Sequence, residues 1–505
     1  MRVWGIGAYM RTAGADSAQG NTGSSAALRP RRSLPRALGL TFASALVWGV
    51  AHLVSGRRIV GVILATMWAA LATAAAVFAV WHQSDLTVMA VQPKWLTTFI
   101  VGSLVLALVW VVVVIRSYQI TKPGGMSYPA HLGGGLLVVL LCSAICAPLL
   151  KVASVSNATR DTVSNIFQAG GRNGTAHVNT DDPWNGRRHV NIALLASDNA
   201  YDRVGTRTDS MTVASIDTQT GNTVLLGLPR NLEHFPMPPG PARNAFPYGF
   251  TGDGPQNPGL LNEVFDYATN HPEIMPGVAQ KQRGPLMVTR TISGIIDQPI
   301  DYYILVDMFG FADIIDAIGG VKIKIVNPIP YGTSGGVLQP GDRVLSGKEA
   351  LWYGRSRNDS DDYTRMGRQK CLLHAVVRQA NPEKVLLKFE KLASATKRAI
   401  ATNIPQELLP AMVRLAEKAH GNAKITSLNF VPPLITTAHP DLTLIRKLSA
   451  NAIGEKPAAS PTTSSSTSPS PSASPTRHRP NYSTDTSGPT PGATTPTSLD
   501  TACPS

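Results

Sequence analysis

The stretch RTDSMTVASIDTQTGNTVLLGLPR (207–230) predicts a β-hairpin. Its two arms, 211–217 and 223–229, are rich in β-branched and apolar residues, and the segment TQTGN between them has the composition of a turn. Strand-like and helix-like patterns alternate on either side of it, from residue 188 to residue 450, as in a single α/β domain of ordinary size. The predicted fold class is therefore α/β, with the hairpin in the sheet.

The register of the hairpin decides which side chains meet at its open end. If Ile216 pairs with Thr223, the same antiparallel register places Asp209 opposite Arg230. An acid and an arginine would then face each other beyond the ends of the paired arms.

Two more charged residues are expected at this edge of the sheet. Arg207 begins the first arm, and Asp198 follows the buried strand HVNIALLAS (189–197). If that strand pairs with the hairpin, two aspartates and two arginines converge, which suits a hard cation that bridges phosphate oxygens. A purely structural ion pair is the alternative, and it is the commoner explanation for a single pair of this kind.

The segment YGRSRNDSDDYTRMGRQ (353–369) contains a second group of polar side chains: Arg355, Arg357, Arg365, Arg368 and Gln369. The first two are two residues apart, so in an extended segment both point to one face. The last three are spaced so that they share a face of a helix. A solvated basic face is the alternative, but the density of arginines favours phosphate, which guanidinium groups bind in a bidentate manner.

Four apolar stretches precede residue 151, and three of them are uncharged and long enough to cross a bilayer as helices: 59–81, 95–115 and 132–150. Basic residues flank the fourth stretch, 37–55, on both sides, so we expect it to enter the membrane without crossing it. Three crossings from a cytoplasmic basic arm, 1–36, place the large domain outside the cell. Four full crossings are the alternative, and they would leave the domain inside unless the N-terminus is external.

The segments on either side of the domain are polar. Residues 151–187 are rich in turn formers and predict a stalk, whereas 451–505 are rich in Ser, Thr and Pro and predict a disordered tail. The spacing of the four cysteines indicates neither a disulfide framework nor a zinc site: Cys142, Cys146, Cys371 and Cys503.

The formal net charge of +14 raises the question of nucleic-acid binding. The predicted cytoplasmic arm is too short for a helix-turn-helix, so we expect no nucleic-acid partner. Basic membrane flanks and a phosphate-rich substrate account for the charge better.

Several motifs, taken in order, resemble the LytR-CpsA-Psr family: RTDSM (207–211), GLPRNL (227–232), DYYILVDMFGF (301–311), DAIGGVKIKI (316–325), LSGKEALWYGRSR (345–357) and DYTRMGRQ (362–369). The resemblance covers roughly 188–380, and the ordered set is far more specific than any one motif. Most members continue Pro-Arg with Asp, whereas Asn231 follows Arg230 here, as in a variant associated with multi-pass actinobacterial members.

The resemblance implies a mixed β-sheet flanked by helices, behind a helical transmembrane region. It also implies a phosphotransferase of cell-wall biogenesis in the cell membrane, with its catalytic domain outside. Such an enzyme moves a glycopolymer from an undecaprenyl-pyrophosphate carrier to peptidoglycan through a phosphodiester bond. The expected partners are the lipid-linked glycan, peptidoglycan and the lipid bilayer.

The family's site residues carry over onto matching positions of this chain. Asp198 and Asp209 would hold Mg²⁺ or Mn²⁺, with Asp202 as an alternative to Asp198, and Asp209 and Arg230 would be catalytic. The residues expected to bind the pyrophosphate are Arg207, Arg230, Arg355, Arg357, Arg365, Arg368 and Gln369.

Two other functions stay open at this point. A lipid-pyrophosphate hydrolase would use the same site with water as the nucleophile, and product analysis with and without peptidoglycan would separate the two enzymes. A membrane-bound transcriptional attenuator would need a cytoplasmic DNA-binding segment, and it would leave the arginine cluster unexplained.

Overall fold

The computed structural model describes residues 33–503 except for 82–87, 168–178, 180–181, 199–206, 255–258, 333–334, 357–360, 380–399, 422 and 455–492. The described residues divide into two compact units, one with residues up to 72 and 108–146, the other with 73–107 and the remainder.

Three N-terminal helices are long and apolar enough to cross a membrane, judged by length and composition: α3 (Arg58–Trp81), α5 (Pro93–Thr121) and α6 (Tyr128–Ile166). They contain the three stretches expected to span the bilayer. The segment 37–55 forms two short helices, α1 (Leu34–Leu46) and α2 (Val50–Val54), separated by a turn. Gly49 makes this turn with φ +90°, and a Cβ there would lie 2.3 Å from the Gly61 carbonyl oxygen, so only glycine fits.

Helix α6 runs well beyond the apolar stretch that ends at residue 150. The first part of the predicted stalk, 151–166, is therefore helical, and the expectation of turns was wrong there. This segment contains neither Gly nor Pro, so nothing in it breaks the helix that the preceding apolar residues begin.

A seven-stranded sheet in the order β11-β10-β3-β2-β1-β4-β9 forms the centre of the second unit. Its strands are β1 (His189–Asp198), β2 (Arg207–Asp217), β3 (Thr223–Leu228), β4 (Tyr302–Asp307), β9 (Ile400–Thr402), β10 (Ile425–Asn429) and β11 (Thr497–Ser498). Strand β1 is parallel to β4, and β3 is parallel to β10, whereas the other neighbours are antiparallel. The mixed sheet is thus confirmed, and so is the hairpin register, since Ile216 pairs with Thr223.

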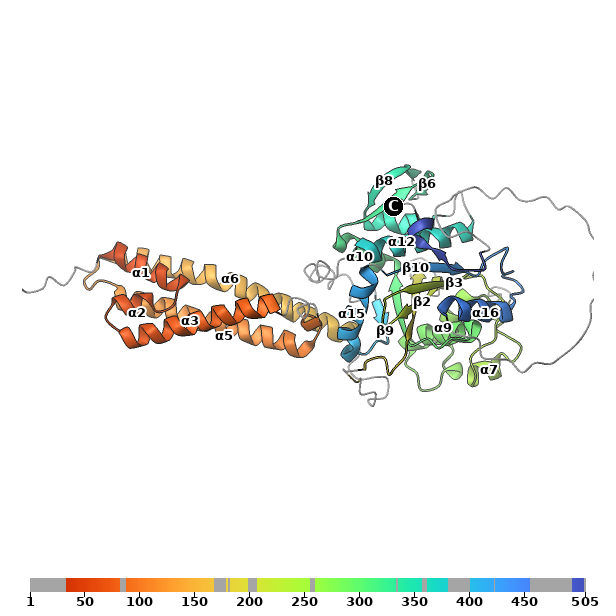
Figure 1. The fold of residues 1–505 in the computed structure, drawn as a ribbon, viewed down its shortest axis with the longest axis horizontal. Helices are drawn as coiled ribbons and strands as arrows, with labels where there is room; N and C mark the ends of the chain where they lie inside the picture. Colours follow the sequence, from red (N-terminus) through yellow and green to blue (C-terminus); the bar gives the residue numbers. More distant parts are fainter. Residues whose placement is uncertain are drawn as a thin grey trace, which may run out of the picture. The chain divides into compact units, whose positions relative to one another are not determined.

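Helices cover both faces of the sheet, which confirms the α-β-α architecture. In Figure 1, α10 and α12 lie on one side of β3 and β10, and α9 and α16 lie on the other. The helices around the sheet are α8 (Val264–Asn270), α9 (Gln280–Ile296), α10 (Met308–Ile318), α11 (Gly347–Arg355), α12 (Asp362–Gln379), α15 (Leu409–His420) and α16 (Leu442–Ile453).

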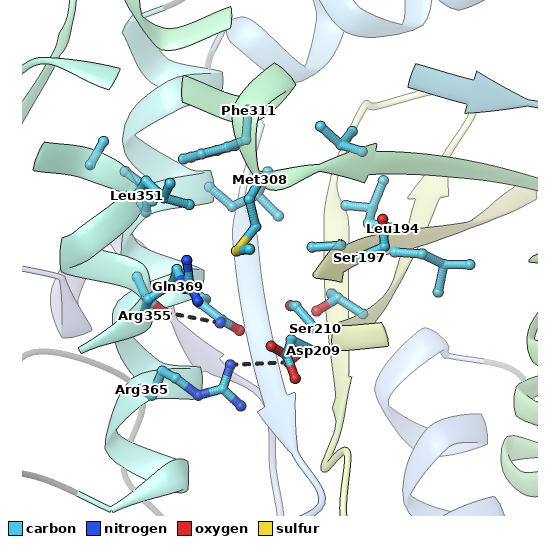
Figure 2. A pocket seen from close by; sticks show the side chains of 18 of the residues that line it. Leu194, Ser197, Asp209, Ser210, Met308, Phe311, Leu351, Arg355, Arg365 and Gln369 are labelled. Carbon is cyan, nitrogen blue, oxygen red and sulfur yellow. Dashed lines mark hydrogen bonds between the residues drawn. The ribbon is translucent and has the colours of Figure 1, made fainter. Parts of the chain in front are cut away.

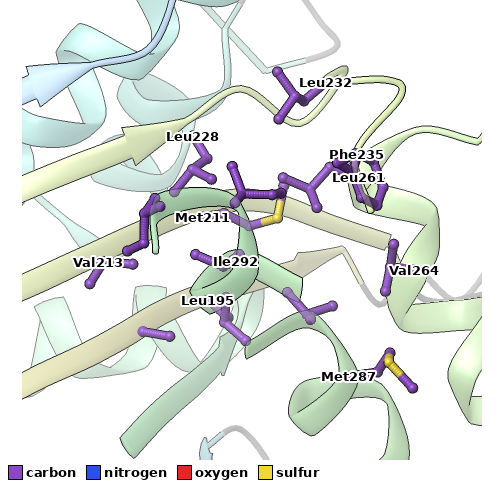
Figure 3. Packing of buried hydrophobic residues seen from close by; sticks show 14 of the residues in the cluster. Leu195, Met211, Val213, Leu228, Leu232, Phe235, Leu261, Val264, Met287 and Ile292 are labelled. Carbon is purple, nitrogen blue, oxygen red and sulfur yellow. The ribbon is translucent and has the colours of Figure 1, made fainter. Parts of the chain in front are cut away.

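The main hydrophobic core lies between the sheet and α9 and α16. Alternate residues of β2, Met211 and Val213, point into it and are fully buried together with Leu228 and Ile292 (Figure 3). Alternation along a strand sends the intervening residues, such as Thr212, to the opposite face. That opposite face is the one on which the site described below is built.

Two small two-stranded sheets, which we call the hairpins because one is nested within the other, follow α10 in the chain and have a core of their own with α11. They consist of β5 (Val321–Ile325) with β8 (Gly341–Leu345), and β6 (Ile329–Tyr331) with β7 (Gly336–Leu338). Ile323, Leu345 and Tyr353 are buried in this second core, so α11 is fixed against the hairpins.

Residues 493–503 are structured, which corrects two expectations. Strand β11 pairs with β10, the short helix α17 (Leu499–Ala502) follows it, and Cys503 forms a disulfide with Cys371 of α12. The predicted disordered tail therefore does not extend to the end of the chain, although residues 455–492 lie outside those described. A separation of 132 residues leaves no spacing signal by which the disulfide could have been recognised.

Candidate active site

A cavity of about 420 Å³ lies between the sheet and helices α10, α11 and α12. Its walls are apolar at one end, where Leu194, Phe311 and Leu351 point inward, and charged at the other, where Asp209 and Arg365 lie (Figure 2). The strand register explains why the sheet side has this character. Leu194 pairs with Thr212 and Ile304 on either side, so one row of side chains faces the cavity.

The ion pair expected at the open end of the hairpin is present. Arg230 Nη1 donates to Asp209 Oδ1 at 2.6 Å, and Arg230 Nε lies 3.3 Å from Asp362 Oδ1. Burial opposes the charged form of Arg230, but the two carboxylates outweigh it and raise the pKa of the guanidinium above its ordinary value. Arg230 is thus a fixed positive charge at the charged end of the cavity, which we call the mouth.

Arg365 of α12 connects this pair to the backbone. Its side chain is only 4% exposed; Nη1 donates to the backbone carbonyl of Asp209 at 3.0 Å and Nη2 to both Asp362 oxygens at 3.0 Å. Asp362 is shared by Arg230 and Arg365, so a single carboxylate fixes both guanidinium groups. Arg365 also lines the cavity and can position Asp209 as well as contact a ligand.

Helix α11 ends at the mouth with Arg355, whose Nη2 lies 3.7 Å from Asp198 Oδ2. Asp198 is 4% exposed at the last position of β1, and it lines the cavity. The Arg355 guanidinium also lies over the Trp352 ring, 5.7 Å from its centroid. Gln369 Nε2 donates to the Gly354 carbonyl at 3.1 Å, which ties the end of α11 to α12.

Other residues expected to bind pyrophosphate are placed differently. Arg368 does not line the cavity; it is buried and donates to the carbonyl of Ser356, so it fixes the chain just after α11. The Arg207 side chain is 50% exposed, lies 3.9 Å from Glu263 Oε1 and does not line the cavity either. Arg357 and Asp202 fall outside the described residues.

The carboxylates at the mouth fit a magnesium or manganese ion that binds together with a phosphate. Asp198 and Asp209 reach the cavity from paired strands, whereas no group of three or more His, Cys, Asp or Glu in the described part of the chain could hold a metal alone. Mg²⁺ commonly takes one or two protein carboxylates and completes its shell with water and substrate phosphate oxygens. The donor set therefore suits such an ion but not a metal enclosed by protein ligands.

Two residues of this region were given no role from the sequence, although Asp362 was noted among the polar residues of 362–369. Asp362 was recognisable in principle, since it stands three residues before Arg365 and can pair with it on a helix. Lys370 was not, because no local pattern marks a lysine whose side chain is only 2% exposed. Its Nζ donates to Thr212 Oγ1, and burial lowers its pKa to about 7.

Comparison with known proteins places this arrangement in a family. The LytR_cpsA_psr family model matches residues 152–433, more than half of the chain. The chain belongs to this family. The predicted resemblance is thereby confirmed, and the match also includes the helical end of α6.

Two relatives share the name polyisoprenyl-teichoic acid–peptidoglycan teichoic acid transferase TagU. The protein of Bacillus mycoides is 25% identical over 278 residues, which are 55% of this chain and 76% of that protein. The protein of Bacillus anthracis is 32% identical over 123 residues, which are 24% of this chain and only 40% of that protein.

Solved structures of similar proteins include TagV of Bacillus subtilis, with 22% identity, a TM-score of 0.39 and coverage of 54% of this chain and 99% of that one. Another is TagT with bound octaprenyl pyrophosphate lipid, with 19% identity, a TM-score of 0.35 and coverage of 53% and 92%.

Proposed function

We propose that this protein is a membrane-anchored phosphotransferase that moves a glycopolymer from a polyprenyl-pyrophosphate carrier to peptidoglycan through a phosphodiester bond. The observation that carries the proposal is that one cavity joins apolar walls to a mouth with arginines and carboxylates. A molecule that is both long-chain lipid and pyrophosphate matches both ends. The names of the TagU relatives support a transferase in cell-wall assembly. We propose that the polyprenyl carrier is undecaprenyl pyrophosphate.

The apolar end suits an isoprenoid chain. Leu194, Ile304, Phe311 and Leu351 come from four different elements and offer the lipid apolar side chains. Burial of apolar surface contributes roughly 25 cal/mol per Å², so a prenyl chain bound there gains much of its affinity from the walls. That affinity anchors the reacting phosphates at the mouth.

The mouth suits the reaction, because phosphoryl transfer depends mainly on positioning and on charge stabilisation. Arg230, Arg355 and Arg365 place three guanidinium groups around the pair Asp198 and Asp209. The two aspartates would hold Mg²⁺ or Mn²⁺, which supplies positive charge beside the phosphate oxygens when bound. The acceptor hydroxyl bonds to the phosphorus that carries the glycan, and polyprenyl phosphate leaves.

Two features of the chain support the proposed location in the cell membrane, with the catalytic domain outside. Three candidate membrane helices precede the catalytic domain and would anchor the protein in the cell membrane. The disulfide Cys371–Cys503 supports an extracytoplasmic domain, because disulfides persist in oxidising compartments and are rare in the cytosol. Both the lipid-linked glycan and peptidoglycan are reached from that side.

The test uses the full chain in detergent with a short lipid-pyrophosphate-linked oligosaccharide, Mg²⁺ and uncrosslinked peptidoglycan, and mass spectrometry of the products. We expect phosphodiester-linked product from the wild type and none from Arg230→Ala. Arg446→Ala is the matched control, since Arg446 bonds to the Gly294 carbonyl and does not line the cavity. Free sugar phosphate without linked product, despite intact acceptor, would assign a hydrolase instead.

A further inference from the structure

Lys370 places a cation at the boundary between the two ends of the cavity. It belongs to α12, and its Nζ crosses to β2, where it donates to Thr212 Oγ1. Thr212 lies two residues further along β2 than Ser210 and pairs with Leu194, one of the residues of the apolar walls. The ammonium group is therefore deeper than the arginines of the mouth and adjacent to the space assigned to lipid.

A second, smaller void connects Lys370 to the charged residues. It measures about 10 Å³, the size of roughly one water molecule, and is lined by Lys370, Gln369, Asp209 and Arg230 among others. Lys370 is thus not isolated behind the cavity wall. A phosphate that contacts Arg230 and Gln369 at the mouth has polar space leading toward the ammonium group.

The neighbouring strand is built to admit this side chain. A Cβ placed on Gly227 of β3 would lie 2.2 Å from Asn429 Oδ1 and 3.2 Å from Lys370 Nζ. Any larger residue at 227 would displace both polar groups. Glycine is required at 227 because Asn429 and Lys370 approach its backbone closely, not because of its backbone conformation. The missing side chain makes room for the ammonium group of Lys370.

The protein gives Lys370 no counterion within the described residues, since no ion pair to a carboxylate is formed there. The charged groups around it are Asp209 and Arg230 at the hairpin mouth and Arg365 on its own helix, and Asp209 already pairs with Arg230. An ammonium group removed from water without an anion is costly, and burial accordingly lowers the pKa of Lys370 to about 7. An anion bound in the adjacent void would supply the missing counterion.

We propose that Lys370 binds the lipid-side phosphate of the pyrophosphate and neutralises the charge that this phosphate gains as it leaves. This role rests on the function proposed above. In the reaction the acceptor oxygen bonds to the glycan-bearing phosphorus, and the bond from that phosphorus to the bridging oxygen breaks. The bridging oxygen departs with the electron pair as part of polyprenyl phosphate, and the acceptor hydroxyl releases its proton to solvent. The negative charge thus grows on the phosphate nearest the apolar walls, where Lys370 lies.

Binding of prenyl monophosphate to the full chain in detergent, measured by calorimetry, tests the role without any transfer reaction. Prenyl monophosphate presents only the lipid-side phosphate. We expect Lys370→Met, which keeps an unbranched side chain but removes the ammonium group, to weaken this binding by roughly tenfold or more, as for a lost hydrogen bond to a charged group. Lys370→Arg should recover part of the affinity. Arg355→Ala should weaken prenyl pyrophosphate more than prenyl monophosphate, because Arg355 lies at the mouth.

Lys418→Met is the matched control, because Lys418 Nζ donates to the Thr218 carbonyl and does not line the cavity. A pH series measures the protons taken up on binding, which would not change if Lys370 only stabilised the fold. A bound phosphate raises the pKa of Lys370, so wild-type binding takes up a proton above about pH 7 and weakens as the pH rises further. Calorimetry of the wild type in buffers of different ionisation enthalpy detects this uptake even if a variant fails to fold.

Two results would overturn the role of Lys370: unchanged affinity of Lys370→Met for prenyl monophosphate, or binding by the wild type without proton uptake at pH 8. A wild type that binds neither prenyl monophosphate nor prenyl pyrophosphate would instead refute the proposed function and the role together.

Discussion

Removal of the disulfide Cys371–Cys503 should destabilise the catalytic domain strongly. The disulfide closes a loop over a sequence separation of 132 residues, for which loop-closure entropy gives about 5 kcal/mol at 25 °C. Losses measured for native disulfides are typically about 2–5 kcal/mol. At roughly 2–4 °C per kcal/mol for a domain of this size, Cys503→Ser should lower the midpoint of thermal unfolding by roughly 4–20 °C.

Apart from the buried Leu499, the C-terminal end has few non-covalent contacts that could replace the disulfide. Strand β11 makes two residue pairs with β10, and Asp500 bonds to His374 Nε2 at 2.8 Å and to Arg378 Nη2 at 3.0 Å. Asp500 is half-exposed, and exposed ion pairs contribute little. Without the covalent link, the end of the chain should separate from the sheet edge before the domain unfolds.

The assay is thermal unfolding of the full chain in detergent, followed by circular dichroism with and without reductant. Reductant should lower the midpoint of the wild type to that of Cys503→Ser and leave that variant unchanged. Cys142→Ser is the control, because Cys142 is a free cysteine of α6. A midpoint of Cys503→Ser within about 2 °C of the wild type would refute the reasoning, since the loop entropy would then have no effect on stability.

Three further predictions concern the mouth and the sheet. Asp362→Asn should lower transfer activity by at least about a hundredfold, because Arg230 and Arg365 lose their shared carboxylate. The control Asp361→Asn should retain activity, since its amide oxygen can still accept the hydrogen bond from the Thr364 backbone amide. Chelation of divalent ions should abolish transfer by the wild type, and Asp198→Asn should raise the Mg²⁺ concentration needed for half-maximal rate; unchanged activity after chelation would contradict the metal assignment. Burial opposes the charge of Asp217, but hydrogen bonds from Thr220, Arg188 and Gln219 lower its pKa to about 2. The ionised Asp217 therefore contributes to the stability of the fold above the pKa of the unfolded state, and this stabilisation is lost as the pH falls through about 2. Asp217→Asn should therefore cost about 1–2 kcal/mol at pH 7 in chemical denaturation, and the difference should shrink as the solution is acidified.

Much of the sheet could be predicted because its signals are local. The turn between the arms of the hairpin fixes its register, and that register brings Asp209 to Arg230 before any tertiary contact is known. The placement of Asp198 required one further assumption, that β1 pairs with β2, which the sequence alone left open and the structure confirms. The family resemblance then supplied the order of the remaining motifs.

Residues whose positions depend on distant partners could not be assigned in the same way. Arg365, Arg368 and Gln369 share a helix and look equivalent in sequence, yet Arg368 turns to the Ser356 carbonyl whereas the other two line the cavity. Which of these side chains faces the cavity depends on where α11 ends, and the local sequence of α12 does not indicate that position. The disulfide partner of Cys371 is unpredictable for the same reason.

The contacts of α12 show why its position controls the site. The strands of the mouth are fixed by backbone hydrogen bonds to neighbouring strands. Helix α12 is instead attached to its surroundings by several of its side chains. Arg365 binds the backbone of β2, Gln369 binds the end of α11, Lys370 binds Thr212 and Cys371 binds the C-terminal end of the chain. A shift of the helix along its axis would move its own two cavity-lining cations, Arg365 and Lys370, relative to Asp198 and Asp209, which the sheet holds in place. The distances between the cations of α12 and the carboxylates of the sheet therefore depend on how firmly α12 is held. The disulfide fixes the helix at Cys371, one residue after Lys370.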